Sequence, residues 1–180
     1  MIVVANAGPL IALARIGHLE LLRLLYGEIY IPPGVRDEVV AAGQECPGAV
    51  EVSAANWIHV VKVHDTVAVQ LLRDRSGVGE SEAIVLAMEL NADLLLMDEA
   101  RGRRVAEGRG LNKTGTVGTL IMAKKRGLIS AVRPLLDRLR ATGFRNSDFG
   151  FGISDFGIRI ADCGMRIADC GLRIADLRRE

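Results

Sequence analysis

The chain has 180 residues, of which 49% are hydrophobic, 25% are charged and 4% are aromatic, and its formal net charge is +1. This length suits one domain, or one domain with an appendage, with a core built from Leu, Ile, Val and Ala. The low net charge excludes a global basic field, so nucleic-acid binding would need local patches such as residues 101–104 and 124–126. Alternatively, these patches are ordinary solvated helix ends.

The cysteines and the apolar runs indicate the cellular compartment in which the protein is found. Cys46, Cys163 and Cys170 are odd in number and lack metal-ligand spacing, which favours a reducing environment. No apolar run reaches the ~18 residues of a membrane span, and the first residues lack the basic region of a signal peptide. We therefore predict a cytoplasmic protein without membrane attachment.

Strands and helices alternate along the chain. Short apolar or alternating runs predict strands at residues 2–5, 28–33, 57–63 and 93–97. Helical periodicity predicts helices at residues 9–16, 18–25, 34–43, 67–75, 79–92, 98–110, 117–125 and 128–141. Such alternation implies right-handed crossovers. The predicted fold class is α/β, a three-layer α/β/α sandwich with a central, mostly parallel sheet.

A repeat with a seven-residue step ends the chain. Aspartates recur at this step, at Asp148, Asp155, Asp162, Asp169 and Asp176. Glycine keeps the same step, which weakens a helix, and the apolar seam of a coiled coil is absent. We therefore predict a folded domain over residues 1–145 and a weakly structured tail over residues 146–180 that reflects tandem duplication. An added helix, hairpin or assembly element is the alternative for the tail.

Polar and acidic residues recur where predicted strands end or helices begin. They are Asn6, Glu38, Glu80, Glu82, Asp98 and Glu99. One acid at a helix start is usually a capping or dipole residue. Several acids that converge on one sheet edge repel each other unless cations bind, and oxygen ligands suit Mg²⁺ or Mn²⁺. Carboxylate-held divalent ions are a common device for phosphodiester cleavage.

Several segments together resemble a known family. The chain shows NAGPLIAL, IPPGVRDEV, GESEAIVLA, LLLMDEARGRR and TGTVGTLIMAKKRGLI in that order. Over roughly residues 1–145, these segments resemble the PIN domain, the nuclease fold of VapC-type toxins. The resemblance implies a Mg²⁺- or Mn²⁺-dependent endoribonuclease that is the toxin of a toxin–antitoxin pair. The implied partners are RNA, a small antitoxin protein and a second copy in a homodimer; a DNA-directed nuclease is an alternative.

The resemblance also implies a set of site residues. Carried over, the metal ligands are Asn6, Glu38, Glu80 and Asp98, of which the three acids are catalytic. Glu82 and Glu99 lie close enough in sequence to serve as substitutes.

Helix geometry separates two of these glutamates. Two residues along a helix is a rotation of about 200°, so Glu80 and Glu82 cannot both point inward. We favour Glu80 at the metal. Arg101, Arg103 and Arg104 are candidates for contacts with the RNA backbone.

Two positions depart from the family pattern. The family's first acid is usually Asp, whereas this chain has Asn6, whose carbonyl oxygen can bind Mg²⁺ but brings no charge. The hydroxyl residue often found two places later is Gly8 here. These departures motivate a second hypothesis, a catalytically impaired PIN fold that acts as a binding module.

The other candidates carry weaker signals. His18, His59 and His64 are scattered, which indicates structural or surface roles. The segment at residues 108–116 fails the P-loop pattern. Thr114 and Thr116 either cap the following helix or contact the backbone or substrate near the active edge. The apolar stripe of residues 67–75 packs in the core by default, and docks a partner if it is exposed.

Overall fold

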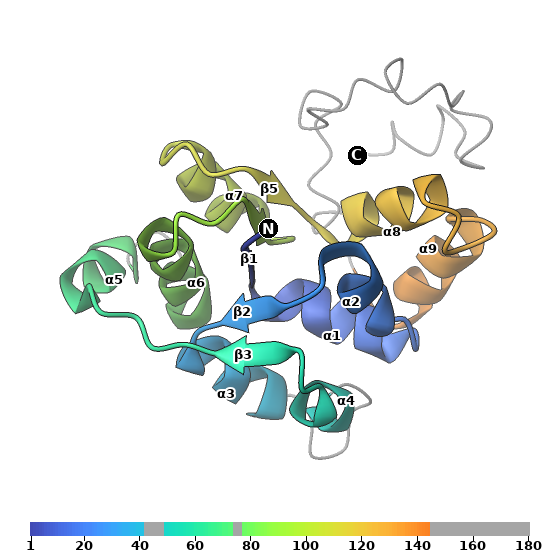
Figure 1. Cartoon of the computed structure of the whole chain (residues 1–180), viewed down its shortest axis with the longest axis horizontal. Coiled ribbons are helices and arrows are strands. Elements are labelled where there is room, and N and C mark those ends of the chain that lie inside the picture. Colours follow the sequence, from blue (N-terminus) through green and yellow to red (C-terminus); the bar gives the residue numbers. More distant parts are fainter. Residues whose placement is uncertain (42–48, 74–76, 145–180) are drawn as a thin grey trace.

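We describe a computed structural model of the chain for residues 1–41, 49–73 and 77–144 (Figure 1). The predicted repeat tail lies outside the described residues, as do the three cysteines. Within the described part of the chain, no helix is both long and apolar enough to cross a membrane.

A five-stranded parallel sheet forms the centre of the fold. The strands are β1 (Val3–Ala5), β2 (Ile29–Ile31), β3 (Ile58–Val60), β4 (Leu94–Leu96) and β5 (Lys113–Thr114). Their order is β3-β2-β1-β4-β5, and every neighbouring pair is parallel. With helices flanking the sheet, this arrangement confirms the predicted three-layer α/β/α fold.

The helices connect the strands and cover the sheet. Within the described residues they are α1 (Ala7–Arg15), α2 (Glu20–Tyr26), α3 (Pro33–Ala41), α4 (Ala49–Ala54), α5 (Thr66–Arg73), α6 (Val78–Glu89), α7 (Ala100–Glu107), α8 (Thr116–Lys125) and α9 (Arg133–Ala141). The sequence did not predict α4 or β5, because both are short and neither shows a clear apolar period. Helix α9 begins later than predicted, with Pro134 in its first turn.

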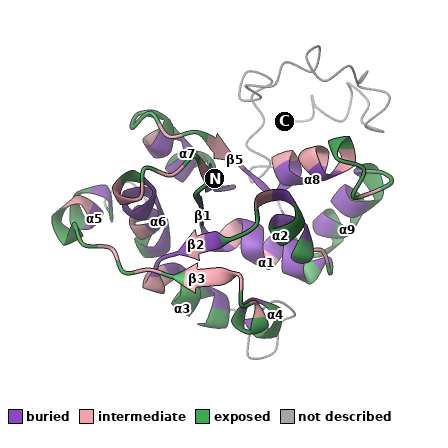
Figure 2. Ribbon diagram, viewed as in Figure 1, coloured by how far each residue is buried: buried purple, intermediate pink, exposed green. Residues whose placement is uncertain are grey.

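The central strand shows why an apolar run folds here as a buried strand. Val3, Val4 and Ala5 have no exposed surface, since β1 has a strand on each side and helices over the sheet (Figure 2). A strand in this place has no polar face, so its sequence is continuously apolar. Pro9 lies in the first turn of α1, where its missing N–H costs no hydrogen bond.

The sheet topology positions the site. From β1 the chain builds β2 and β3 on one side, then returns to build β4 and β5 on the other side. The switch point therefore lies between β1 and β4, and ligands of parallel α/β sheets bind beyond the carboxyl ends of the strands at such a point. Asn6 directly follows β1, and Asp98 lies two residues beyond the end of β4. Helix α6 packs against both strands and carries Glu80 in its first turn.

Candidate active site

Asn6 and Asp98 form a buried corner at the switch point. Each is only 6% exposed. The Asn6 backbone N–H donates a hydrogen bond to the Leu96 carbonyl oxygen (2.9 Å), which aligns the ends of the two strands. The Asn6 Oδ1 atom is buried and accepts no hydrogen bond within the described residues. Because a buried acceptor without a donor is costly, this oxygen fits a ligand that attracts electron pairs, such as a cation.

Asp98 is held by the start of helix α8. The Thr116 backbone N–H donates to Asp98 Oδ1 (2.7 Å), and the Thr116 hydroxyl donates to Asp98 Oδ2 (2.5 Å). Thr116 is the first residue of α8, so the carboxylate also lies at the positive end of the helix dipole. Both effects favour the ionised carboxylate.

Gly115 makes this close approach possible. A Cβ atom at Gly115 would lie 2.5 Å from Asp98 Oδ1 and 3.3 Å from the Met97 carbonyl oxygen. Any other side chain would therefore push the start of α8 away from Asp98. Arg103, on α7, is buried and donates from Nη1 to the same Met97 carbonyl (2.9 Å). The backbone that carries Asp98 is thus braced from two helices.

The second part of the site is a group of glutamates. Glu80 is 6% exposed, accepts a hydrogen bond from the Gly77 backbone N–H (3.2 Å) and is hydrogen-bonded to the Glu99 side chain. Burial raises the pKa of Glu80 from 4.5 to about 8, and the Glu99 hydrogen bond and charge and the Glu38 charge add to this shift. With this pKa, Glu80 is mostly protonated at neutral pH and can donate the hydrogen bond to Glu99.

Glu38 belongs to the same group electrostatically. Burial raises the pKa of the Glu38 carboxyl, and the charge of Glu99 raises it further. A Cβ atom at Gly79 would lie 2.8 Å from Glu38 Oε2, so the carboxyl lies against the first turn of α6. The charge of Glu99 thus raises the pKa of both Glu38 and Glu80, in addition to the effect of their burial.

The Glu82 side chain makes a different contact from that of Glu80. Its Oε2 accepts a hydrogen bond from the Gly34 backbone N–H (2.8 Å) at the start of α3. Of the two possible substitutes in the sequence, the structure therefore joins Glu99 to Glu80 and places Glu82 on the start of α3.

The two parts of the site adjoin each other. A Cβ atom at Gly102 would lie 3.4 Å from Glu80 Oε2 and 2.5 Å from Met97 Sδ, so Gly102 lies between Glu80 and the residue before Asp98. Within the described residues, no three carboxylate, imidazole or thiol groups already stand where they could share one metal ion. The oxygen donors are gathered at one edge, while their spacing is not that of a closed metal site.

The three arginines that were candidates for RNA contacts differ in exposure. Arg101 and Arg104 are exposed on α7, whereas Arg103 is buried beneath that helix.

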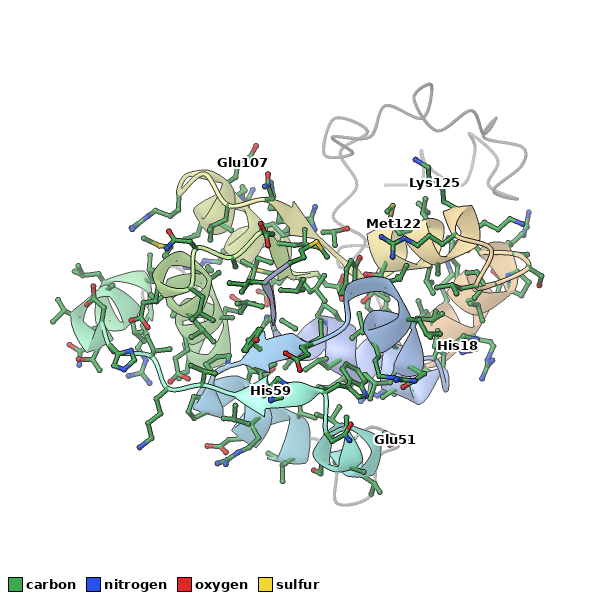
Figure 3. All side chains as sticks on the ribbon, in the orientation of Figure 1. His18, Glu51, His59, Glu107, Met122 and Lys125 are labelled. Atoms are coloured by element: carbon green, nitrogen blue, oxygen red, sulfur yellow. The ribbon has the colours of Figure 1, made fainter. Side chains whose placement is uncertain are left out.

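The three histidines of the chain do not lie together. Figure 3 shows His18 beside α2 and His59 on β3, and His64 is paired with Glu89. Sequence reasoning left the role of Thr116 open and did not find that of Gly115; the signal was the TGT segment between a strand and a helix.

The comparisons with known proteins agree with this architecture. The family model described as DUF3368, a PIN domain, matches residues 2–150. Because this match covers most of the chain, the protein belongs to the PIN-domain family. No curated protein and no solved structure matches the chain. Membership in the family indicates a nuclease-type function and RNA binding, and PIN domains generally use divalent metals.

Proposed function

We propose that the protein is a Mg²⁺- or Mn²⁺-dependent endoribonuclease whose metal ligands are Asn6, Glu38, Glu80 and Asp98. The observation that carries this proposal is that three of these four residues, Asn6, Glu38 and Glu80, place oxygen atoms at the switch point without enough positive charge or hydrogen-bond donors around them. Among the described residues, no group donates a hydrogen bond to the Asn6 Oδ1 atom, and the pKa values of Glu38 and Glu80 are raised. A divalent cation at this edge would bind the Asn6 oxygen and would stabilise the charged forms of Glu38 and Glu80.

The chemistry of the donors fits this class of ion. The set contains carboxylate and amide oxygens and no thiol or imidazole, a combination that suits Mg²⁺ or Mn²⁺ rather than zinc. When bound, the ion supplies an activated water and stabilises the charge on the leaving oxygen. Glu99 shares its hydrogen bond with Glu80, so it is the substitute ligand that the geometry favours.

The residues themselves have distinct roles in this proposal. Asp98 enters as a fixed carboxylate because Thr116 holds both of its oxygens. Glu80, whose pKa is raised to about 8, holds a proton at neutral pH and must release it when a cation binds. Binding is therefore expected to release protons and to strengthen as the pH rises.

Arg101 and Arg104 are the proposed contacts for the RNA backbone. Both are exposed on α7, which begins two residues after Asp98. Phosphate contacts of this kind position the substrate without reading its sequence. Arg103 is the less suitable of the three predicted arginines, because its guanidinium braces the Met97 carbonyl.

We further propose that the nuclease is the toxin of a toxin–antitoxin pair. An exposed apolar surface on α5 supports a protein partner, since Val67 and Leu71 are 66% and 71% exposed and lie four residues apart on one helix face. A small antitoxin and a second copy of the chain are the two proposed partners.

Asp98→Asn tests the proposed activity. The wild type should cleave single-stranded RNA only when Mn²⁺ or Mg²⁺ is added, and the variant should lose about a thousandfold or more of this rate. Asp137→Asn, an exposed aspartate on α9, is the matched control and should keep full activity. Equal activity in wild type and Asp98→Asn would contradict the proposal, and a DNA strand of the same sequence distinguishes RNase from DNase.

The alternative function is a PIN fold that has lost catalysis and acts as a binding module. The neutral amide of Asn6 favours it, because the site has one charge fewer than the family pattern. Calorimetry with Mn²⁺ separates the two functions. Absence of binding at millimolar Mn²⁺, with binding restored by Asn6→Asp, would support the binding module.

A further inference from the structure

We propose that Thr116 is a positioning residue for Asp98. The Thr116 hydroxyl fixes the orientation of the Asp98 carboxylate before any metal binds. It takes the place of a hydroxyl at position 8, where this chain has glycine. This inference rests on the proposed function, since it concerns the same site. It also makes a claim about the metal-free protein that can be tested separately.

The first support is the geometry of the contact. Thr116 is fully buried, and it meets Asp98 twice, through its backbone N–H on Oδ1 and through its hydroxyl on Oδ2. Two bonds to two oxygens fix both the position and the rotation of the carboxylate plane. Each carboxylate oxygen keeps a second lone pair, so these bonds leave Asp98 able to bind a cation.

The second support comes from Gly8, which lies close to the same carboxylate. A Cβ atom at Gly8 would lie 3.5 Å from Asp98 Oδ2, which is ordinary van der Waals contact. The oxygen that Thr116 bonds therefore also faces the first turn of α1. A serine at position 8 would fit and would bring its hydroxyl within reach of Oδ2. This chain has glycine there, and the hydroxyl comes from α8 instead.

The third support is the contrast with Thr119, one turn further along α8. Thr119 is also fully buried, and its hydroxyl donates to the Gly115 carbonyl (3.0 Å). This is the usual bond of a threonine inside a helix, and Thr119 also hydrogen-bonds the Tyr26 side chain on α2. The Thr116 hydroxyl instead donates to Asp98, a proposed metal ligand, as expected of a residue that positions a ligand.

The experiment compares Thr116→Val with Thr119→Val by calorimetry with Mn²⁺. Both variants remove one buried hydroxyl from α8, and both keep the backbone N–H and the side-chain shape. Thr116→Val should weaken Mn²⁺ binding about 10- to 100-fold, whereas Thr119→Val should leave it nearly unchanged. Thr116→Ser should bind like the wild type, and Gly8→Ser in the Thr116→Val background should restore most of the lost affinity.

Equal affinities for Thr116→Val and the wild type, or equal losses in the two valine variants, would overturn the inference. If the wild type binds no Mn²⁺, the proposed function fails, and the inference is judged from crystal structures of the metal-free proteins. There the Asp98 carboxylate should be rotated or split between conformers in Thr116→Val and ordered in Thr119→Val. An Asp98 side chain unchanged in Thr116→Val would then refute it.

Discussion

The two halves of the candidate site place their carboxyl groups in opposite electrostatic environments. On one side, both oxygens of Asp98 accept hydrogen bonds, and a helix start and a buried arginine hold its position. On the other side, burial and the charge of Glu99 raise the pKa values of Glu38 and Glu80, and the pKa of Glu80 reaches about 8. The fold therefore stabilises the charge of Asp98, whereas it opposes the charges of Glu38 and Glu80 until a cation binds.

Two such kinds of ligand are expected together in a metal site. A rigid ligand fixes where the ion binds, and ligands with raised pKa values provide charge only when the ion displaces their protons. Asn6 lies beside the rigid half and adds an oxygen without a charge. The glutamates therefore have to supply most of the negative charge that the ion needs.

Among the changes that test this contrast, the largest expected effect on metal affinity comes from adding a charge to the half that contains Asp98. Asn6→Asp should strengthen Mn²⁺ binding by on the order of tenfold or more, because ligand charge sets the affinity of sites for hard cations. Calorimetry at pH 7 measures this change. The same substitution should destabilise the metal-free protein, because it adds a buried carboxylate beside Asp98. An unchanged affinity would show that Asn6 does not face the ion.

The next effect concerns the glutamate half and the pH. Because the pKa of Glu80 is raised from 4.5 to about 8, the folded state holds a proton that the unfolded state has lost over this range. The free energy of unfolding of the metal-free protein should therefore fall as the pH rises from about 4.5 to about 8, by a few kcal/mol at most. Urea unfolding at several pH values measures this slope.

A pair of variants assigns that pH dependence. Glu80→Gln should flatten the slope, since glutamine has no proton to lose. Glu82→Gln, two residues along the same helix, is the matched control: its amide oxygen can still accept the hydrogen bond from the Gly34 N–H, and the slope should remain. An identical slope in the wild type and Glu80→Gln would show that the glutamate half is not the source.

The smallest effect concerns the approach of RNA to the site. Arg101→Ala and Arg104→Ala should each lower RNA affinity modestly and reduce the slope of log affinity against log salt by about one. Filter binding in Mg²⁺-free buffer over a range of salt concentrations measures this slope. Arg140→Ala on α9 is the control for loss of an exposed arginine. A slope that changes equally in all three variants would indicate a nonspecific loss of charge.

Much of the fold could be predicted because strand and helix periods are local properties. The buried strands β1 and β4 and the long helix α6 follow directly from continuous apolar or helical patterns. Strand β5 has only two half-buried residues, Lys113 and Thr114, and is a strand because β4 offers it an edge to pair with. No local pattern encodes that pairing.

The sequence by itself determined the kinds of residue available to the site. It placed Asn6, Glu80 and Asp98 at strand ends and helix starts, because buried strands must be apolar and polar side chains can appear only where they stop. The tertiary structure alone decided which of these residues meet. It joined Thr116 to Asp98 and Glu99 to Glu80, and it turned Glu82 and Arg103 toward backbone groups. Those choices depend on how α3, α7 and α8 pack around the sheet, and packing between distant segments leaves no periodic trace in a single sequence.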